Sequence, residues 1–268
     1  MRIRVNQNTV YRYDPPAAGL IKVLRLTPRN YEGQYVVSWR IDITPDARLA
    51  AHEDAFGNIT HVFTADGPFN ELTVEVGGQV ETHNTDGIVR GTVERFPPSL
   101  FLRHTALTQV DPAIREFAEA LRAKSGGDVL GVLHALLDRL HSEMGHDIDP
   151  AQAATGAARS FALKHGVAQD LAHIFISAAH SLGIPARYVG GYFRRAEIAD
   201  QPDPGHAWVE AHVPDLGWVG FDPANGLCPT DAHVRVAVGL DSLGAAPVRS
   251  THDGAGVETA AFAIKVGQ

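Results

Sequence analysis

Polar and apolar residues alternate along several short stretches near the start of the chain. The alternation is clear at 2–6, 34–42 and 70–76, and a period of two residues is typical of strands with one buried face. Turns that contain Gly and Asn separate these stretches, and this spacing favours an antiparallel sandwich or barrel. We therefore predict an N-terminal β-rich domain over residues 1–96 that packs on or positions the rest, with substrate recognition as the alternative role.

The periodicity changes after a pair of prolines, Pro97-Pro98, which interrupts a helix and a central strand alike. Asp111-Pro112 is a start signal for a helix. Residues 128–141 carry apolar side chains over a wide helical face. After a loop, a short helix is expected at 156–164. We predict that a second domain covers residues 97–268.

The strongest helical pattern follows a turn at Gly166 and runs to about Leu182. Its apolar residues have the three-and-four spacing of a buried helix: Leu171, Ile174, Phe175, Ala178 and Leu182. The first residue of such a helix lies where unpaired backbone N–H groups and the positive end of the dipole meet. A cysteine thiolate is stabilised at such a place, but this chain has Ala168 there.

Further strands are expected on the C-terminal side of this helix. Residues 185–194, 206–210 and 217–222 have strand patterns, and the tail has two more at 232–238 and 258–266. A helix packed on an antiparallel sheet, preceded by a β domain, is an α+β arrangement. We predict the α+β class for the whole chain.

Three blocks of this region resemble the transglutaminase-like proteins, whose pattern runs Gly-Val-Cys-x-Asp, His-Ala-Trp-Val-Glu and Gly-Trp-x-x-Phe-Asp-Pro. The corresponding blocks here are Gly166–Asp170, His206–Glu210 and Gly217–Pro223, and the segment 182–192 also fits. The close match spans 164–225, and its one departure is alanine for the family's cysteine. In the first third, Tyr-Arg-Tyr-Asp at 11–14 and Asp-Ala-Phe-Gly-Asn at 54–58 resemble the β domain that precedes this core in bacterial members.

The resemblance implies a papain-like core and thiol-dependent chemistry on peptide or protein amides through an acyl-enzyme, with hydrolysis expected rather than cross-linking. The catalytic positions would be Ala168 in place of the nucleophile, His206 as the base and Asp222 as the group that orients it. We expect the Asp222 carboxylate roughly 2.6–3.2 Å from one ring nitrogen of His206. A sulfur at position 168 is expected roughly 3–4 Å from the other nitrogen. Trp208 and Tyr192 are expected to border the substrate.

Each of these residues has a plainer explanation. His206 could be a structural histidine at a strand start, and Asp222 before a proline could be only a turn former. Asp170 and His173, near the helix start, are expected to be structural. Cys228 is rejected as an alternative nucleophile because it has no helix N-terminus, and Ser160 and Ser177 because they have no adjacent base.

Two explanations of Ala168 stay open. The chain is either a deliberately or very recently inactivated form of an enzyme with cysteine at this position, or a natural pseudoenzyme that binds peptides in the same cleft. We favour the first, because His206, Asp222 and the surrounding motif all keep the family type. A purely structural β/α scaffold would leave the pairing of His206 with Asp222 unexplained.

The composition of the chain limits which partners, disulfides and cellular locations we expect. The chain has 268 residues, a formal net charge of −8 and one cysteine, which argues against a nucleic-acid partner and excludes an internal disulfide framework. The N-terminus lacks the apolar core of a signal peptide and no run is long enough to span a membrane, so we expect a cytoplasmic protein. No cofactor or metal is expected, although His146, Asp147 and Asp149 cluster in one loop. Nothing indicates an oligomeric state.

Overall fold

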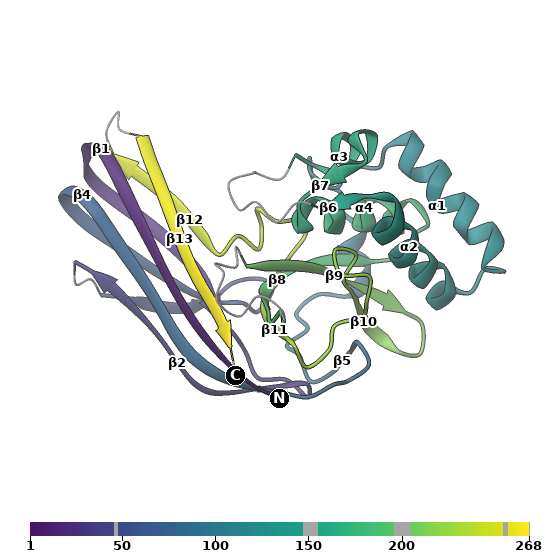
Figure 1. The fold of residues 1–268 in the computed structure, drawn as a ribbon, viewed down its shortest axis with the longest axis horizontal. Coiled ribbons are helices and arrows are strands. Elements are labelled where there is room, and N and C mark those ends of the chain that lie inside the picture. The colour runs from purple at the N-terminus through teal and green to yellow at the C-terminus, as the bar shows by residue number, and fades with distance from the viewer. Residues whose placement is uncertain (46–47, 147–154, 196–204, 254–256, 268) are drawn as a thin grey trace.

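The computed structural model describes residues 1–45, 48–146, 155–195, 205–253 and 257–267. Two antiparallel sheets lie side by side, and helices cover only the second (Figure 1). The expected α+β class, with an N-terminal antiparallel β domain and a helix packed on an antiparallel sheet, is confirmed.

The first sheet is built on two long strands, β1 and β4, which pair along nearly their whole length. Lys22 apart, the strongly buried side chains of β1 are mostly apolar and recur at every second position, with a register shift between Arg12 and Ala17. The order is β12-β1-β4-β2, with β13 also on β1 and β3 on β4. The bounds are β1 (Arg2–Thr27), β2 (Gln34–Thr44), β3 (Ala50–Glu53), β4 (Ile59–Thr82), β12 (Val248–Asp253) and β13 (Val257–Gly267).

The expected division of the chain at residue 96 is wrong for the last two strands. The sequence pattern assigned 97–268 wholly to the second domain, but β12 and β13 both pair with β1 in the first sheet. Conversely β5, before the expected boundary, pairs with β10 in the second sheet. An alternating strand pattern shows that a strand exists and does not show which distant strand it will join.

The second sheet has the order β11-β8-β9-β10-β5. A separate short parallel pair, β6 with β7, lies before the long central helix. The bounds are β5 (Ile88–Val89), β6 (Gly145–His146), β7 (His165–Gly166), β8 (Ala186–Phe193), β9 (His206–Val213), β10 (Gly217–Phe221) and β11 (His233–Gly239).

The helices gather on one face of the second sheet (Figure 1). The expected starts at Asp111 and Asp128 are confirmed, since each side chain accepts a backbone N–H of the first turn. The central helix α4 packs on β8 and β9, and most of its residues are buried. The bounds are η1 (Pro98–Leu102), α1 (Pro112–Lys124), α2 (Val129–Glu143), α3 (Ala157–Leu163) and α4 (Ala168–Ser181).

The two sheets are fixed to each other by a shared core and by buried hydrogen bonds. Ile3 and Val5 of β1 belong to the same apolar cluster as α4. The side-chain amide of Asn58 donates to the Val238 carbonyl at 2.7 Å and accepts from the Val238 N–H at 2.8 Å. This amide therefore extends the backbone pairing of β11 into the first sheet and holds one edge of the second sheet against it.

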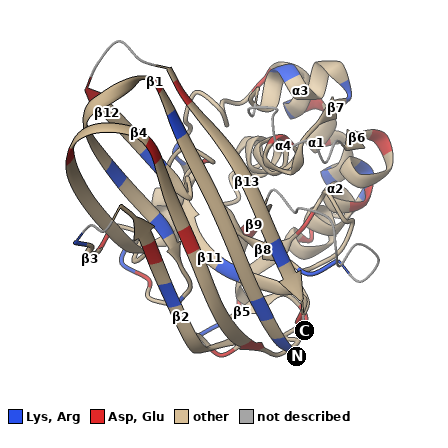
Figure 2. Ribbon diagram, turned by 60° about the vertical axis from the view of Figure 1, so that its left-hand side comes forward, with Lys and Arg blue, Asp and Glu red and all other residues tan. Residues whose placement is uncertain are grey.

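Acidic and basic side chains are interspersed over the first sheet rather than separated into patches (Figure 2). Some pair across neighbouring strands, as Arg12 does with Glu71 at 3.1 Å. Exposed pairs of this kind add little stability. Within the described residues, no helix has the length and apolar character needed to cross a membrane.

Candidate active site

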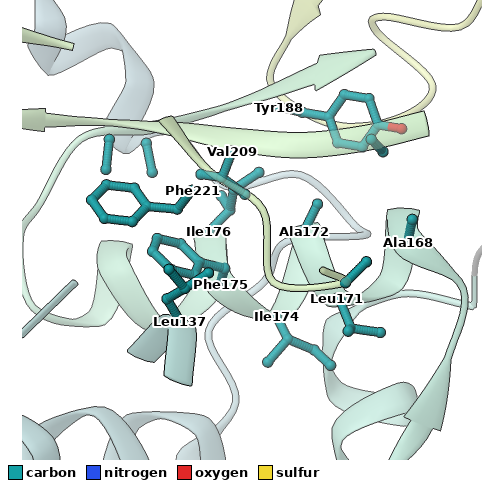
Figure 3. Close-up of a cluster of buried hydrophobic side chains, with 14 of the residues drawn as sticks. Leu137, Ala168, Leu171, Ala172, Ile174, Phe175, Ile176, Tyr188, Val209 and Phe221 are labelled. Carbon is teal, nitrogen blue, oxygen red and sulfur yellow. The ribbon is translucent and has the colours of Figure 1, made fainter. Parts of the chain in front are cut away.

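Ala168 is the first residue of α4, as the sequence predicts. The preceding residue, Val167, has an extended backbone with φ −86° and ψ 171°, so the helix begins abruptly after β7. Ala168 is only 8% exposed, and Figure 3 shows its methyl group at the end of α4, beyond Ala172. The first N–H groups of α4 have no partner within the helix and are available to a developing negative charge.

Asp170 holds this end of the helix in place. Its Oδ1 accepts the backbone N–H groups of Thr155 and Gly156, at 2.8 and 3.2 Å, and its Oδ2 accepts that of Val167 at 3.3 Å. The carboxylate thus joins the approach to α3 to the start of α4. His173, one turn later, is fully buried and accepts the Ser242 N–H at Nε2. Both residues have the structural contacts expected of them.

His206 begins β9 and is bound by Asp222, which follows β10. The distance from His206 Nε2 to Asp222 Oδ2 is 2.6 Å, within the expected range, and both side chains are fully buried. Adjacent antiparallel strands produce this contact, since β9 pairs with β10. Because the carboxylate can only accept, we assign a proton to Nε2, which in the neutral imidazole leaves the lone pair on Nδ1.

Asp222 is surrounded by donors. Its Oδ1 accepts the N–H groups of Ala224 and Asn225, and its Oδ2 accepts His206, His233 and the side-chain amide of Asn225. Burial raises the pKa of Asp222, but the two histidines outweigh burial and hold that pKa far below its usual range. The carboxylate therefore stays ionised, and the same residue both caps a local turn and orients His206.

His233, the first residue of β11, is fixed in one tautomer. The Thr230 N–H donates to its Nδ1 at 3.0 Å, so the proton must be on Nε2, which lies 3.1 Å from Asp222 Oδ2. Burial is the main cause that lowers the pKa of His233. A neutral His233 therefore donates a hydrogen bond to Asp222 Oδ2, the same oxygen that binds His206.

His206, Asp222 and His233 have the spacing of a metal site, since one ligand atom of each lies within 4.8 Å of the others. A histidine that binds a metal through Nε2 normally donates its other ring N–H to an acceptor. At His233 that other nitrogen faces a backbone donor, the Thr230 N–H. The cluster is thus arranged for hydrogen bonding to Asp222, and its tautomer does not suit a metal.

One polar atom of the cluster has no partner. His206 Nδ1 is buried and makes no hydrogen bond within the described residues, although Nε2 of the same ring is firmly bound. Phe193 and Trp208 hold the ring, with centroid distances of 5.2 and 6.1 Å. A buried acceptor without a partner is unusual enough to require an explanation. Here the unpaired atom is the lone pair that a base would use.

A cavity of about 360 Å³ borders this site. Gln169 and Gly205, which adjoin Ala168 and His206 in sequence, are both in its lining. Tyr192 also lines the cavity, and its hydroxyl donates to Gln7 of the first sheet at 2.8 Å.

Trp208 has a different position from the one expected. It is 2% exposed, belongs to an apolar cluster with Trp218 and Val189, and is not in the cavity lining. A Cβ on Gly191 would lie 2.8 Å from the Trp208 ring and closer still to the Val234 carbonyl oxygen, so the close packing of both requires glycine there. Trp208 therefore supports the His206 ring from behind.

The comparisons with known proteins agree with this architecture. Residues 3–81 match the bacterial transglutaminase-like N-terminal region, and residues 115–223 match the transglutaminase-like superfamily. An uncharacterised protein of Mycobacterium leprae is 30% identical over 271 residues, covering 95% of this chain and 94% of its own. The chain belongs to the transglutaminase-like superfamily.

Two further similarities are weaker, the first because it is short and the second because its identity is low. The protein YebA of Bacillus subtilis is 32% identical over 79 residues, which is 25% of this chain and 10% of YebA. A crystal structure from Cytophaga hutchinsonii, named as a candidate cysteine protease, superposes with a TM-score of 0.78 at 19% identity, over 100% of this chain and 90% of that one. At that identity the second similarity supports the fold alone.

Other nucleophiles do not fit this transglutaminase-like core. Burial, with smaller contributions from Asp138 and Asp86, raises the pKa of the Cys228 thiol, which disfavours its reactive form. Ser160 and Ser177 are buried and bonded to Thr155 and to the Gln109 carbonyl. Of the loop cluster considered for a metal, Asp147 and Asp149 lie outside the described residues.

Sequence reasoning missed three residues of the site: Asn225, His233 and Phe193. Asn225 follows Asp222 by three positions, and an Asp-Pro-x-Asn turn was a usable signal for an amide that folds back onto the carboxylate. His233 and Phe193 are opposite each other in the pairing of β11 with β8. Only that long-range register brings them to His206, so no local pattern could have identified them.

Proposed function

We propose that this chain carries the active site of a cysteine peptidase or amidase of the transglutaminase-like type, in a form that Ala168 inactivates. The substrate class is a peptide or protein amide, and the intermediate of the intact enzyme is a thioester acyl-enzyme. The observation that carries the proposal is His206 Nδ1, a buried lone pair without a partner on a ring that Asp222 orients through Nε2.

In the intact enzyme, the residues would act in a defined order. A cysteine at position 168 transfers its proton to His206 Nδ1, and the ionised Asp222 stabilises the imidazolium that forms. The thiolate adds to the amide carbonyl, and backbone N–H groups at the start of α4 stabilise the oxyanion. The imidazolium then protonates the leaving amine, and water, activated by the same histidine, hydrolyses the thioester.

Without sulfur at position 168 no acyl-enzyme can form. A methyl group cannot be ionised, and burial disfavours the thiolate of the remaining cysteine, Cys228. We accordingly expect the chain to bind an amide substrate and not to turn it over. We also propose a cytoplasmic location, which a cell fractionation would test.

The experiment is Ala168→Cys, followed by alkylation with iodoacetamide at pH 6 and mapping of the product by mass spectrometry. A thiol at the start of α4 beside His206 is expected to have a pKa of roughly 3.5–7.5 instead of about 8.5. Position 168 should therefore alkylate quickly and Cys228 slowly. The same variant should cleave members of a casein or peptide library.

The matched controls are the unsubstituted chain, which reports Cys228 alone, and Ala168→Cys combined with His206→Gln. The histidine substitution should abolish the fast alkylation. Alkylation at position 168 no faster than that of a free thiol, with no amide cleaved or joined, would contradict the proposal. Preferential labelling of Cys228 would mean that the nucleophile belongs on another element.

The second candidate function is a natural pseudoenzyme that binds peptides without cleaving them. The bordering cavity favours it, because a binding site needs the cavity and not the sulfur. The codon for position 168 in the native gene distinguishes the two: cysteine selects the enzyme, and alanine selects the binding module.

A further inference from the structure

We propose that the cavity between the two sheets is the subsite for an uncharged apolar side chain of the peptide substrate, and that the first sheet supplies one wall of it. This inference rests on the proposed function, since it names the substrate feature that the same site would read. It assigns a recognition role to β1, β12 and β13, strands of the first sheet that carry none of the catalytic residues.

The position of the cavity is the first argument. Its lining includes Gln169, the second residue of α4, and Gly205, the residue before His206. It also includes Tyr11 of β1 and Phe262 of β13. A group bound in the cavity therefore touches the immediate neighbours of both catalytic positions and the first sheet at the same time.

The chemistry of the walls is the second argument. Most of the lining side chains are apolar or aromatic, and they come from both sheets: Tyr11, Leu26, Val236, Val248, Phe262 and Ile264. Phe262 remains 48% exposed. A cavity of about 360 Å³ is in the range of small-ligand sites and has room for a large side chain.

Charge selects among possible occupants. Among the described residues, the lining contains two charged side chains, and each has an ion-pair partner. Glu258 Oε2 accepts from Lys22 at 2.9 Å, and Arg25 Nε donates to Asp54 at 2.9 Å. A charged substrate group would lose its hydration and meet only opposite charges that are already shared with another side chain, whereas an apolar side chain has no charge to desolvate.

Arg25 also offers a hydrogen-bond donor for the peptide backbone. Arg25 Nη1 is buried and makes no hydrogen bond within the described residues, although Nε of the same side chain is bound. Because Arg25 lines the cavity, we pair this donor with a peptide carbonyl oxygen next to the apolar side chain. The site therefore offers an apolar wall and a donor, which together suit a peptide better than a free hydrocarbon.

Ala168 makes the test direct, because binding can be measured without turnover. The probes are amide-capped hexapeptides with p-benzoylphenylalanine at one position and the other positions randomised. They are cross-linked to the unsubstituted chain by light and mapped by mass spectrometry. We expect cross-links on β13 at Phe262 or Ile264. Competitor peptides with Leu or Phe should suppress these cross-links at about tenfold to a hundredfold lower concentration than peptides with Asp or Lys. This is the difference in affinity expected for burial of one large apolar side chain.

Two substitutions on one exposed strand provide the matched comparison. Ala260 lines the cavity opposite Tyr11, so Ala260→Trp should fill it and lower the cross-linking at least tenfold. Ala261 is exposed on the other face of β13 and does not line the cavity, so Ala261→Trp should change little. Urea unfolding of both variants checks that they fold alike.

Equal cross-linking by the two variants, or cross-links only outside the lining, would overturn the inference. Two outcomes distinguish a failure of the subsite from a failure of the proposed function. If Ala168→Cys gives an activated thiol and Ala260→Trp does not alter its peptide preference, the enzyme assignment stands and the subsite is wrong. If position 168 shows no activated thiol while apolar peptides still cross-link to β13, the subsite stands and the enzyme assignment fails.

Discussion

Asp222 is the most extensively hydrogen-bonded residue of the candidate site, because five donors converge on its carboxylate. Two of them, the N–H groups of Ala224 and Asn225, come from the turn that follows β10, and two come from histidines on β9 and β11. A carboxylate so heavily bonded stays ionised well below the usual pKa of an aspartate and is a poor base towards His206 Nε2. It can orient the imidazole and stabilise its cation without removing its proton.

We predict that Asp222→Asn lowers the free energy of unfolding by about 3 kcal/mol, because an amide cannot accept from every donor and presents N–H groups to some of them. Urea unfolding at pH 7 measures the loss. Asp215→Asn is the matched control: Asp215 is exposed, has a φ of +66° that asparagine also tolerates, and should change stability by less than about 0.5 kcal/mol. A loss equal to that of the control would mean that Asp222 does not anchor the cluster.

At the scale of elements, β9 carries two separate charge networks on one short strand. Its first residue, His206, belongs to the site. Its fifth, Glu210, is fully buried and accepts from Arg187 Nε and Arg235 Nε, each at 2.7 Å. Glu94 accepts both terminal nitrogens of Arg187, at 2.7 and 2.9 Å. Glu210 thus fastens β8, β9 and β11 together, and it fixes the register that brings His233 to Asp222.

We predict that Glu210→Gln lowers the free energy of unfolding by about 3–5 kcal/mol at pH 7, because the buried Arg235 guanidinium loses its counter-charge and Arg187 keeps only Glu94. Burial raises the pKa of Glu210, but Arg235 and Arg187 outweigh it and lower the pKa to about 2. The folded pKa lies below the unfolded one, so the stability that Glu210 contributes is present above pH 4.5 and is lost as the pH falls towards 2.

The measurement is urea unfolding of both proteins at several pH values between 2 and 7. The difference between the unsubstituted chain and Glu210→Gln should shrink over the acid range. The exposed residue Glu75 provides the control, since Glu75→Gln should change the free energy of unfolding at pH 7 by less than about 0.5 kcal/mol. A Glu210→Gln difference that does not change with pH would show that the ion pairs are not the source of its effect.

Elements with a local signal were predictable from the sequence. The start of α4 at Ala168 follows from three-and-four spacing after Gly166, and the caps at Asp111 and Asp128 follow from their side chains. The pairing of His206 with Asp222 was predictable only because the motif blocks resemble a known family. His233 and the placement of β12 and β13 were not predictable, because each depends on the register between distant strands and one strand pattern fits several partners.

Across the whole molecule, the first and last strands form one surface, and a buried ion pair fastens them. Lys22 of β1 is fully buried, and its Nζ donates to Glu258 of β13 and to Ser250 of β12. The same ammonium lies 3.5 Å from the centre of the Tyr11 ring. Burial lowers the pKa of Lys22, and Glu258 partly offsets this. The Lys22 ammonium therefore obtains its hydrogen-bond acceptors and its counter-charge from strands at the other end of the chain.

We predict that Glu258→Gln lowers the free energy of unfolding by about 3–5 kcal/mol at pH 7, because it leaves a buried ammonium without a counter-charge. The folded pKa of Lys22 is then depressed further below 10.5, so the penalty is full at neutral pH and recedes as the pH rises towards that value. Urea unfolding at pH 7 and pH 10 measures both effects.

The matched rescue is Lys22→Met combined with Glu258→Leu, which replaces the ion pair with apolar side chains of similar size. Such replacements are often neutral or stabilising, so the double variant should recover most of the stability that Glu258→Gln loses. A double variant as unstable as the single one would indicate that lost packing, and not the unpaired charge, causes the defect.

The pairing of β1 with β13 also determines the order in which the two sheets can fold during synthesis. Arg4 pairs with Gly267, and the two ends of the chain lie together (Figure 1). At about 5–20 residues per second, the edge of β1 would wait roughly 10–50 s for its partner to be synthesised. During that interval the second sheet can fold while a long strand edge stays open to other chains. The yield of folded protein in a cell therefore depends on how well that edge is protected during synthesis, which equilibrium stability does not measure.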